Sequence, residues 1–112
     1  GYWKSHPNSW PVNELTVGGR AYDINELLRI LDTPPKKGDA TYILAHQLIA
    51  AKLNFLIGCP PPIVNGRNLI DEADGWLTTY PPGKPPKKRT DRESMVKLAE
   101  KLDNYNNGKP YD

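Results

Sequence analysis

Two histidines, His6 and His46, are the side chains in this chain best suited to acid–base chemistry or metal binding. An imidazole titrates near neutral pH, so either ring could serve as a general base. Two histidines and a carboxylate would also suffice to hold zinc. This site requires the N-terminal segment to fold over the helix that carries His46. The simpler interpretation of His46 is a core histidine that donates one hydrogen bond, because buried polar groups normally find a partner.

Other chemistry-bearing patterns are missing from the sequence. It has no GxSxG, HExxH or CxxCH motif and no glycine-rich phosphate loop. Cys59 is the single cysteine, so no internal disulfide can form, and we interpret it as a small packing residue. Near the end, Tyr105 stands where a calcium loop beginning at Asp103 would need an acid or amide. We therefore expect a protein that is not an enzyme, with no catalytic residue and no cofactor. A metal- or small-ligand-binding, hydrolytic protein that uses His6 and His46 is the alternative.

The N-terminal aromatic segment, GYWKSHPNSWP over residues 1–11, is the densest cluster of aromatic side chains. Flat rings stack on sugars, and tyrosine and tryptophan dominate the energetics of protein interfaces. The competing interpretation is a lid whose tryptophans bury a large apolar area against the core. We favour the lid, with binding left to its exposed part. The candidate binding residues here are Tyr2, Trp3, His6 and Trp10.

A second candidate contact is the basic loop, residues 81–90, with the sequence PPGKPPKKRT. Its cations, which could attract an anionic partner, are Lys84, Lys87, Lys88 and Arg89. The plainer interpretation is a solvated, semi-rigid connector. Single-stranded nucleic acid usually stacks on aromatic side chains, and the loop has none. The net charge of +2 is also small, so we expect no sequence-specific nucleic-acid binding.

Proline clusters divide the chain into helical segments. Apolar spacing predicts four helices, at about 24–31, 40–56, 62–79 and 91–106. Capping boxes are expected at Asp23/Glu26 and at Thr90/Glu93, and Asp39 is the expected N-cap of the second helix. A short β-hairpin is expected around Gly18-Gly19, with strands near 15–17 and 20–22.

These elements predict a mainly α fold. The second helix is apolar nearly all round, which is typical of a helix buried by its neighbours. Long proline-rich connections disfavour a regular up-down arrangement. We expect one domain over residues 1–112, an irregular four-helix bundle around the second helix. The aromatic segment and hairpin occupy 1–22, the helices 23–108, and the basic loop 81–90. No apolar run is long enough to span a membrane.

Five segments in matching order carry a resemblance: GYWKSHPNSWPV, LTVGGRAY, GDATYILAHQLIAAKLN, EADGWL and LDNYNNG. Together they resemble a domain that recurs in bacterial secreted and cell-surface proteins and has no established activity. The resemblance implies a secreted or cell-surface location, often within a larger protein. It also implies a buried polar network beneath the lid, formed by His46, Gln47, Asp74, Asp103 and Tyr105. The predicted function is therefore a non-catalytic binding or structural module, for example an accessory subunit, whose partner is a protein or a cell-surface polymer.

Overall fold

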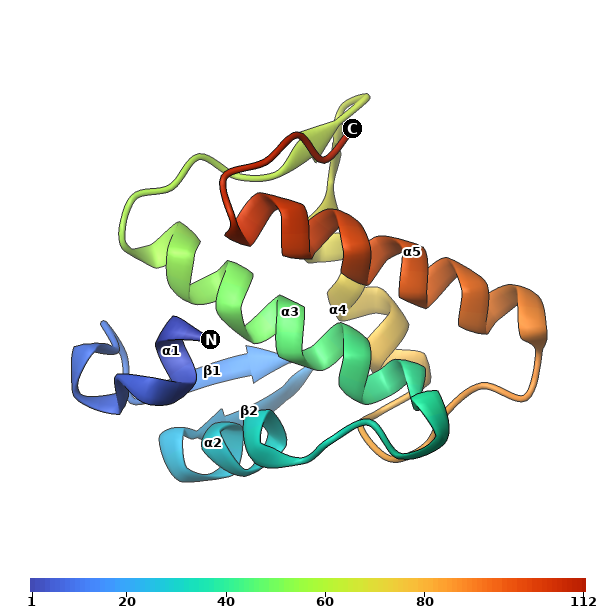
Figure 1. Ribbon diagram of the computed structural model, residues 1–112, viewed down its shortest axis with the longest axis horizontal. Coiled ribbons are helices and arrows are strands. Elements are labelled where there is room, and N and C mark those ends of the chain that lie inside the picture. Colours follow the sequence, from blue (N-terminus) through green and yellow to red (C-terminus); the bar gives the residue numbers. More distant parts are fainter.

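A computed structural model of all 112 residues shows a mainly helical chain with a small antiparallel hairpin (Figure 1). The longer elements are β1 (Glu14–Val17), β2 (Arg20–Asp23), α2 (Ile24–Asp32), α3 (Ala40–Leu56), α4 (Leu69–Thr79) and α5 (Arg89–Asn106). Shorter ones are α1 (Tyr2–Ser5), the 3-10 turns η1 (Pro7–Ser9) and η2 (Lys36–Gly38), and the two-residue strands β3 (Ile63–Val64) and β4 (Arg67–Asn68). No helix combines the length and the apolar character that crossing a membrane would need.

Helix α3 is the centre of the core, and its predicted bounds are confirmed. Its side chains at Leu44, Leu48, Ile49 and Leu53 are fully buried. Helices α2, α4 and α5 and strand β1 all pack against it, as its central place in Figure 1 shows. Asp39 caps the helix as expected, because its carboxylate accepts a hydrogen bond from the Thr41 N–H at 2.8 Å.

The β1–β2 hairpin and helix α2 also follow the sequence prediction. Gly18 and Gly19 both have positive φ angles, +59° and +78°, as a tight two-residue turn requires. At the start of α2 the predicted capping box is present. The Glu26 N–H donates to Asp23 at 2.8 Å, and the Asp23 N–H donates to Glu26 at 3.0 Å.

The third predicted helix begins later than expected. Residues 63–68 form the β3–β4 hairpin, and α4 begins only at Leu69. The physical reason is the Asn65-Gly66 pair, whose φ angles of +51° and +76° make a hairpin turn. The Asn68 side chain then accepts a hydrogen bond from the Ile70 N–H at 2.9 Å and so caps α4.

The start of α5 is also corrected. The helix begins at Arg89, its N-cap Lys88 makes no side-chain cap, and the predicted Thr90/Glu93 capping box is absent. Thr90 already lies inside the first turn, so it cannot act as the cap. Asp91 instead accepts a hydrogen bond from the Tyr80 hydroxyl at 2.6 Å, which joins the first turn of α5 to the end of α4.

Both tryptophans of the N-terminal aromatic segment lie in the core. Trp3 is 6 % exposed and Trp10 is 9 % exposed. The Trp10 indole N–H donates to the Trp3 carbonyl oxygen at 2.8 Å, which folds the segment back on itself. Tyr2, by contrast, is 56 % exposed. Tyr2 is therefore the exposed ring among the tyrosine and tryptophan side chains of this segment.

Candidate functional site

A pocket of about 650 Å³ opens between α1, α3 and the C-terminal end of α5. We call it the α1–α3–α5 pocket. The polar side chains that line it are Lys4, Ser9, His46, Gln47, Asn54, Asp103, Asn106 and Asn107. Its apolar lining comes from Tyr2, Trp3, Leu31, Ala50 and Ile57. Depressions with an apolar lining and a few convergent polar groups are where proteins usually bind small ligands.

Hydrogen bonds between amide groups run across this pocket and join its three helices. The Trp3 indole N–H donates to Asn54 Oδ1 at 3.0 Å, and Asn54 Nδ2 donates to Asn106 Oδ1 at 3.0 Å. Asn106 Nδ2 then donates to the Gln47 carbonyl oxygen at 3.1 Å and to Gln47 Oε1 at 3.0 Å. We call these four residues the amide network.

The amide network has one orientation, and Trp3 sets it. An indole N–H can only donate, so Asn54 must present its oxygen to Trp3 and its NH₂ group to Asn106. Asn106 must then accept through Oδ1 and donate through Nδ2 to Gln47. A buried tryptophan therefore determines which way the amide groups of the pocket are oriented.

Gln47 was predicted for a polar network, whereas Asn54 was missed. The signal for Asn54 lies in its spacing from Gln47. Seven residues are close to two turns of helix, so both amides fall on the same face of α3. That face also carries His46 and Ala50 beside the pocket.

The two histidines have different partners. His46 lines the pocket, and its Nε2 lies 2.7 Å from the Ile30 carbonyl oxygen. His6 Nδ1 lies 2.7 Å from the Tyr2 carbonyl oxygen, and its ring stacks on Tyr2 with centroids 4.2 Å apart. No group of three or more histidine, cysteine or acidic side chains is arranged to hold a metal ion. The alternative prediction was a metal site formed by His6, His46 and a carboxylate. The structure does not bring such a set of ligands together.

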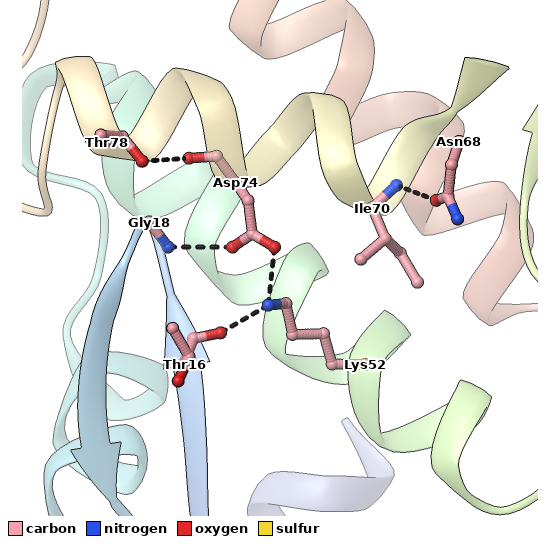
Figure 2. Close-up of polar contacts among 7 residues, drawn as sticks. All are labelled: Thr16, Gly18, Lys52, Asn68, Ile70, Asp74 and Thr78. Atoms are coloured by element: carbon pink, nitrogen blue, oxygen red, sulfur yellow. Dashed lines mark hydrogen bonds and ion pairs between the residues drawn. The ribbon is translucent and has the colours of Figure 1, made fainter.

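Asp74 belongs to a different cluster, shown in Figure 2. Its carboxylate accepts a hydrogen bond from the Gly18 N–H at 2.9 Å and pairs with Lys52 Nζ at 2.7 Å. Lys52 also donates to the Thr16 carbonyl oxygen. These contacts join the hairpin turn, α3 and α4, and Asp74 does not line the pocket.

Asp103 and Tyr105 also differ in their surroundings. Asp103 lines the pocket, and its Oδ1 accepts a hydrogen bond from Asn107 Nδ2 at 2.9 Å. The Tyr105 hydroxyl is the one buried side-chain polar atom without a hydrogen-bond partner. Burial, with smaller contributions from Cys59 and Tyr111, raises the pKa of Tyr105 to about 12. Tyr105 is therefore not a member of the amide network.

The cations of the basic loop, Lys84, Lys87, Lys88 and Arg89, are all exposed, and none lines the α1–α3–α5 pocket. Arg89 pairs with Glu93 at 3.5 Å. The loop is attached to the rest of the fold, because the Gly83 N–H donates to Thr41 Oγ1 at 2.9 Å. Arg92, one turn into α5, donates to the Gly38 carbonyl oxygen at 3.0 Å, which brings Lys36 and Lys37 to the same side.

No family model matches this chain, and neither a curated protein nor a solved structure shows significant similarity to it. The candidate site therefore rests on the geometry of the chain alone.

Proposed function

We propose that this protein is a non-catalytic binding module that takes a small polar ligand in the α1–α3–α5 pocket. The observation that carries the proposal is the amide network, whose donors and acceptors are held in one orientation by Trp3. Carboxamides neither gain nor lose protons near neutral pH, so they suit recognition rather than acid–base chemistry. A fixed arrangement also lowers the side-chain entropy that the protein loses when a ligand binds.

In this proposal the N-terminal aromatic segment is a lid on an irregular four-helix bundle formed by α2, α3, α4 and α5. The burial of Trp3 and Trp10 supports that interpretation. The lid would then have two roles. It covers the end of the core, and through Trp3 it supplies one wall of the pocket.

The basic loop is proposed as a second contact, to an anionic protein surface or cell-surface polymer. Its support is a set of exposed cations on a backbone that is attached to α3 through Gly83. A secreted or cell-surface location, as an accessory subunit or a part of a larger bacterial surface protein, belongs to the same proposal. That location is supported only by the resemblance of the sequence segments.

The pocket is tested by titrating the whole protein with amino acids, short peptides, nucleosides and sugars while recording its NMR spectrum. The proposal expects one class to shift the side-chain NH₂ signals of Gln47, Asn54 and Asn106. The variant Asn107→Ala should weaken the binding of that ligand, since Asn107 lines the pocket. Asn25→Ala is the matched control, because Asn25 is an exposed asparagine on α2 that does not line the pocket. Equal weakening by both variants, or no shift with any class, would refute the proposal.

The basic loop has its own test, using heparin and polyglutamate as anionic probes at low and high salt. We expect the variant Lys87→Glu/Lys88→Glu to weaken binding at low salt, because exposed charges act strongly only when little salt screens them. The control variant Lys97→Glu/Lys101→Glu makes the same charge change further along α5. If both variants lose binding equally, the attraction comes from overall charge and not from the loop.

A further inference from the structure

We infer that the α1–α3–α5 pocket selects a neutral carbohydrate, with the Tyr2 ring as the surface on which a sugar ring stacks. This inference rests on the proposed function and adds the chemical class of the ligand. It depends on three observations: the free donors and acceptors in the pocket, the exposed apolar surface at its mouth, and the balance of charge around it.

The free hydrogen-bonding groups of the pocket are of both kinds. Because the Ile30 carbonyl oxygen can only accept, His46 Nε2 must carry a hydrogen, which makes Nδ1 an acceptor in the neutral ring. Gln47 uses its oxygens within the amide network and keeps both hydrogens of Nε2, while Asn54 keeps one hydrogen of Nδ2. His46 Nδ1 and Gln47 Nε2 have no partner within the protein and are not among its buried unpartnered atoms, so both remain reachable from solvent.

Adjacent free donors and acceptors match the hydroxyl groups of a sugar. Each hydroxyl both donates and accepts, so a pair of neighbouring hydroxyls can bridge a ring nitrogen and an amide NH₂ group. His46 and Gln47 are neighbours on α3 that offer this combination. An apolar ligand would leave these groups desolvated and unpaired, which disfavours binding.

Two exposed apolar side chains stand at the pocket and suit the C–H faces of a pyranose. Tyr2 is 56 % exposed and Ile57 is 57 % exposed, and both line the pocket. One face of the Tyr2 ring stacks on His6, with an angle of 11° between the ring planes, and Trp3 meets the Tyr2 ring nearly at right angles. The ring is therefore held in place by two neighbours, and Tyr2 is still more than half exposed. Trp3 and Trp10 cannot serve in this way, because both are buried.

The charges around the pocket favour a neutral ligand. Lys4 lines the pocket, but its Nζ pairs with Asp32 at 3.2 Å. Asp103 lines the same pocket, and its Oδ1 accepts a hydrogen bond from Asn107 Nδ2. The Asp103 carboxylate would repel a ligand with net negative charge, and the Lys4 ammonium group would repel one with net positive charge. The cations of the basic loop do not line this pocket.

The test uses soluble oligosaccharides of glucose, mannose, galactose, xylose and N-acetylglucosamine, with nucleosides and short peptides as separate panels. Binding to the whole protein is followed by the Trp3 indole signal and the Gln47 and Asn54 side-chain signals. We expect one sugar class to bind and Tyr2→Ala to weaken it about tenfold, the usual scale for removing an aromatic contact. Tyr2→Phe should retain affinity because the ring is kept. Ile63→Ala is the control, an exposed apolar residue that does not line the pocket.

The outcomes separate this inference from the proposed function. If nucleosides or peptides shift the pocket signals and no sugar does, the carbohydrate inference is wrong and the binding pocket stands. If sugars bind equally well to Tyr2→Ala and to the unchanged protein, the stacking surface is wrong and the inference falls. If no panel shifts these signals, both proposals fail together.

Discussion

The substitution Gly18→Ala tests how the hairpin turn is held against α4. A Cβ atom added at Gly18 would lie 2.7 Å from both the carbonyl carbon and the carbonyl oxygen of Leu77. These are backbone atoms, so they cannot move aside as a flexible side chain could. The φ angle of +59° adds left-handed strain of about 1 kcal/mol. Overpacking of this kind costs about 1–3 kcal/mol. We therefore expect a total loss of about 2–4 kcal/mol in the free energy of unfolding.

The matched control is Gly19→Ala, one residue along the same turn. Gly19 has a φ angle of +78°, but the nearest atom to its added Cβ would be Thr78 Oγ1 at 3.7 Å. It therefore shares the strain and lacks the collision, so the expected loss is about 1 kcal/mol. Urea unfolding of both variants, followed by circular dichroism, gives the difference directly. Equal losses would show that the contact between the turn and α4 does not determine stability.

Three further predictions concern stability. Trp10→Ala should lower the free energy of unfolding by about 3–5 kcal/mol, because a buried indole is removed; calorimetry showing a loss below about 1 kcal/mol would contradict the lid. Asp74→Asn keeps an acceptor for the Gly18 N–H but loses the charge that pairs with Lys52, so we expect a loss of about 1–2 kcal/mol in urea unfolding. That loss should largely disappear when Lys52→Met is already present, and an unchanged loss would rule out the ion pair as its cause. Tyr105→Phe should leave stability at neutral pH unchanged or raised, because the hydroxyl has no partner. Burial raises the folded-state pKa of Tyr105 from 10.0 to about 12. The contribution of this raised pKa to the free energy of unfolding is therefore complete below pH 10 and is lost as the pH rises through about 12. Unfolding measured across this range should show a smaller decline for Tyr105→Phe, and identical profiles would refute the assignment.

The parts of the fold that were predicted correctly are those with strong local signals. Asp39 and the continuous apolar pattern after it define α3, and the Asp23/Glu26 spacing defines the start of α2. The Gly18-Gly19 pair is likewise a local signal, and it predicts the turn of the first hairpin. In each case the residues that decide the structure lie within a few positions of one another.

The errors arose where two local signals competed. The apolar spacing predicts a helix from about residue 62, although Asn65-Gly66 is a hairpin signal of its own. At the start of α5, Thr90 and Glu93 have capping-box spacing, but the helix already begins at Arg89. Helix propensity alone does not decide where such a helix begins, because tertiary contacts of the flanking segments also determine its first residue.

The site was harder to predict, because its groups come together only in the folded chain. Gln47 and His46 were expected to be polar groups near the lid, and both line the pocket. Asp74 and Tyr105 were grouped with them, yet one holds the hairpin turn and the other has an unpaired hydroxyl. No spacing in the sequence shows that Asn54 meets Trp3, because the two positions are 51 residues apart.

That separation has a consequence for how the protein folds. The bonds from Trp3 to Asn54 and from Asn54 to Asn106 span 51 and 52 positions, so each closes a long loop. Contacts of long sequence separation carry a large loop-closure entropy and form after local ones. The hairpin with α2 can assemble early, whereas the amide network must wait until the last turn of α5 has docked. We therefore expect the α1–α3–α5 pocket to be completed late in folding.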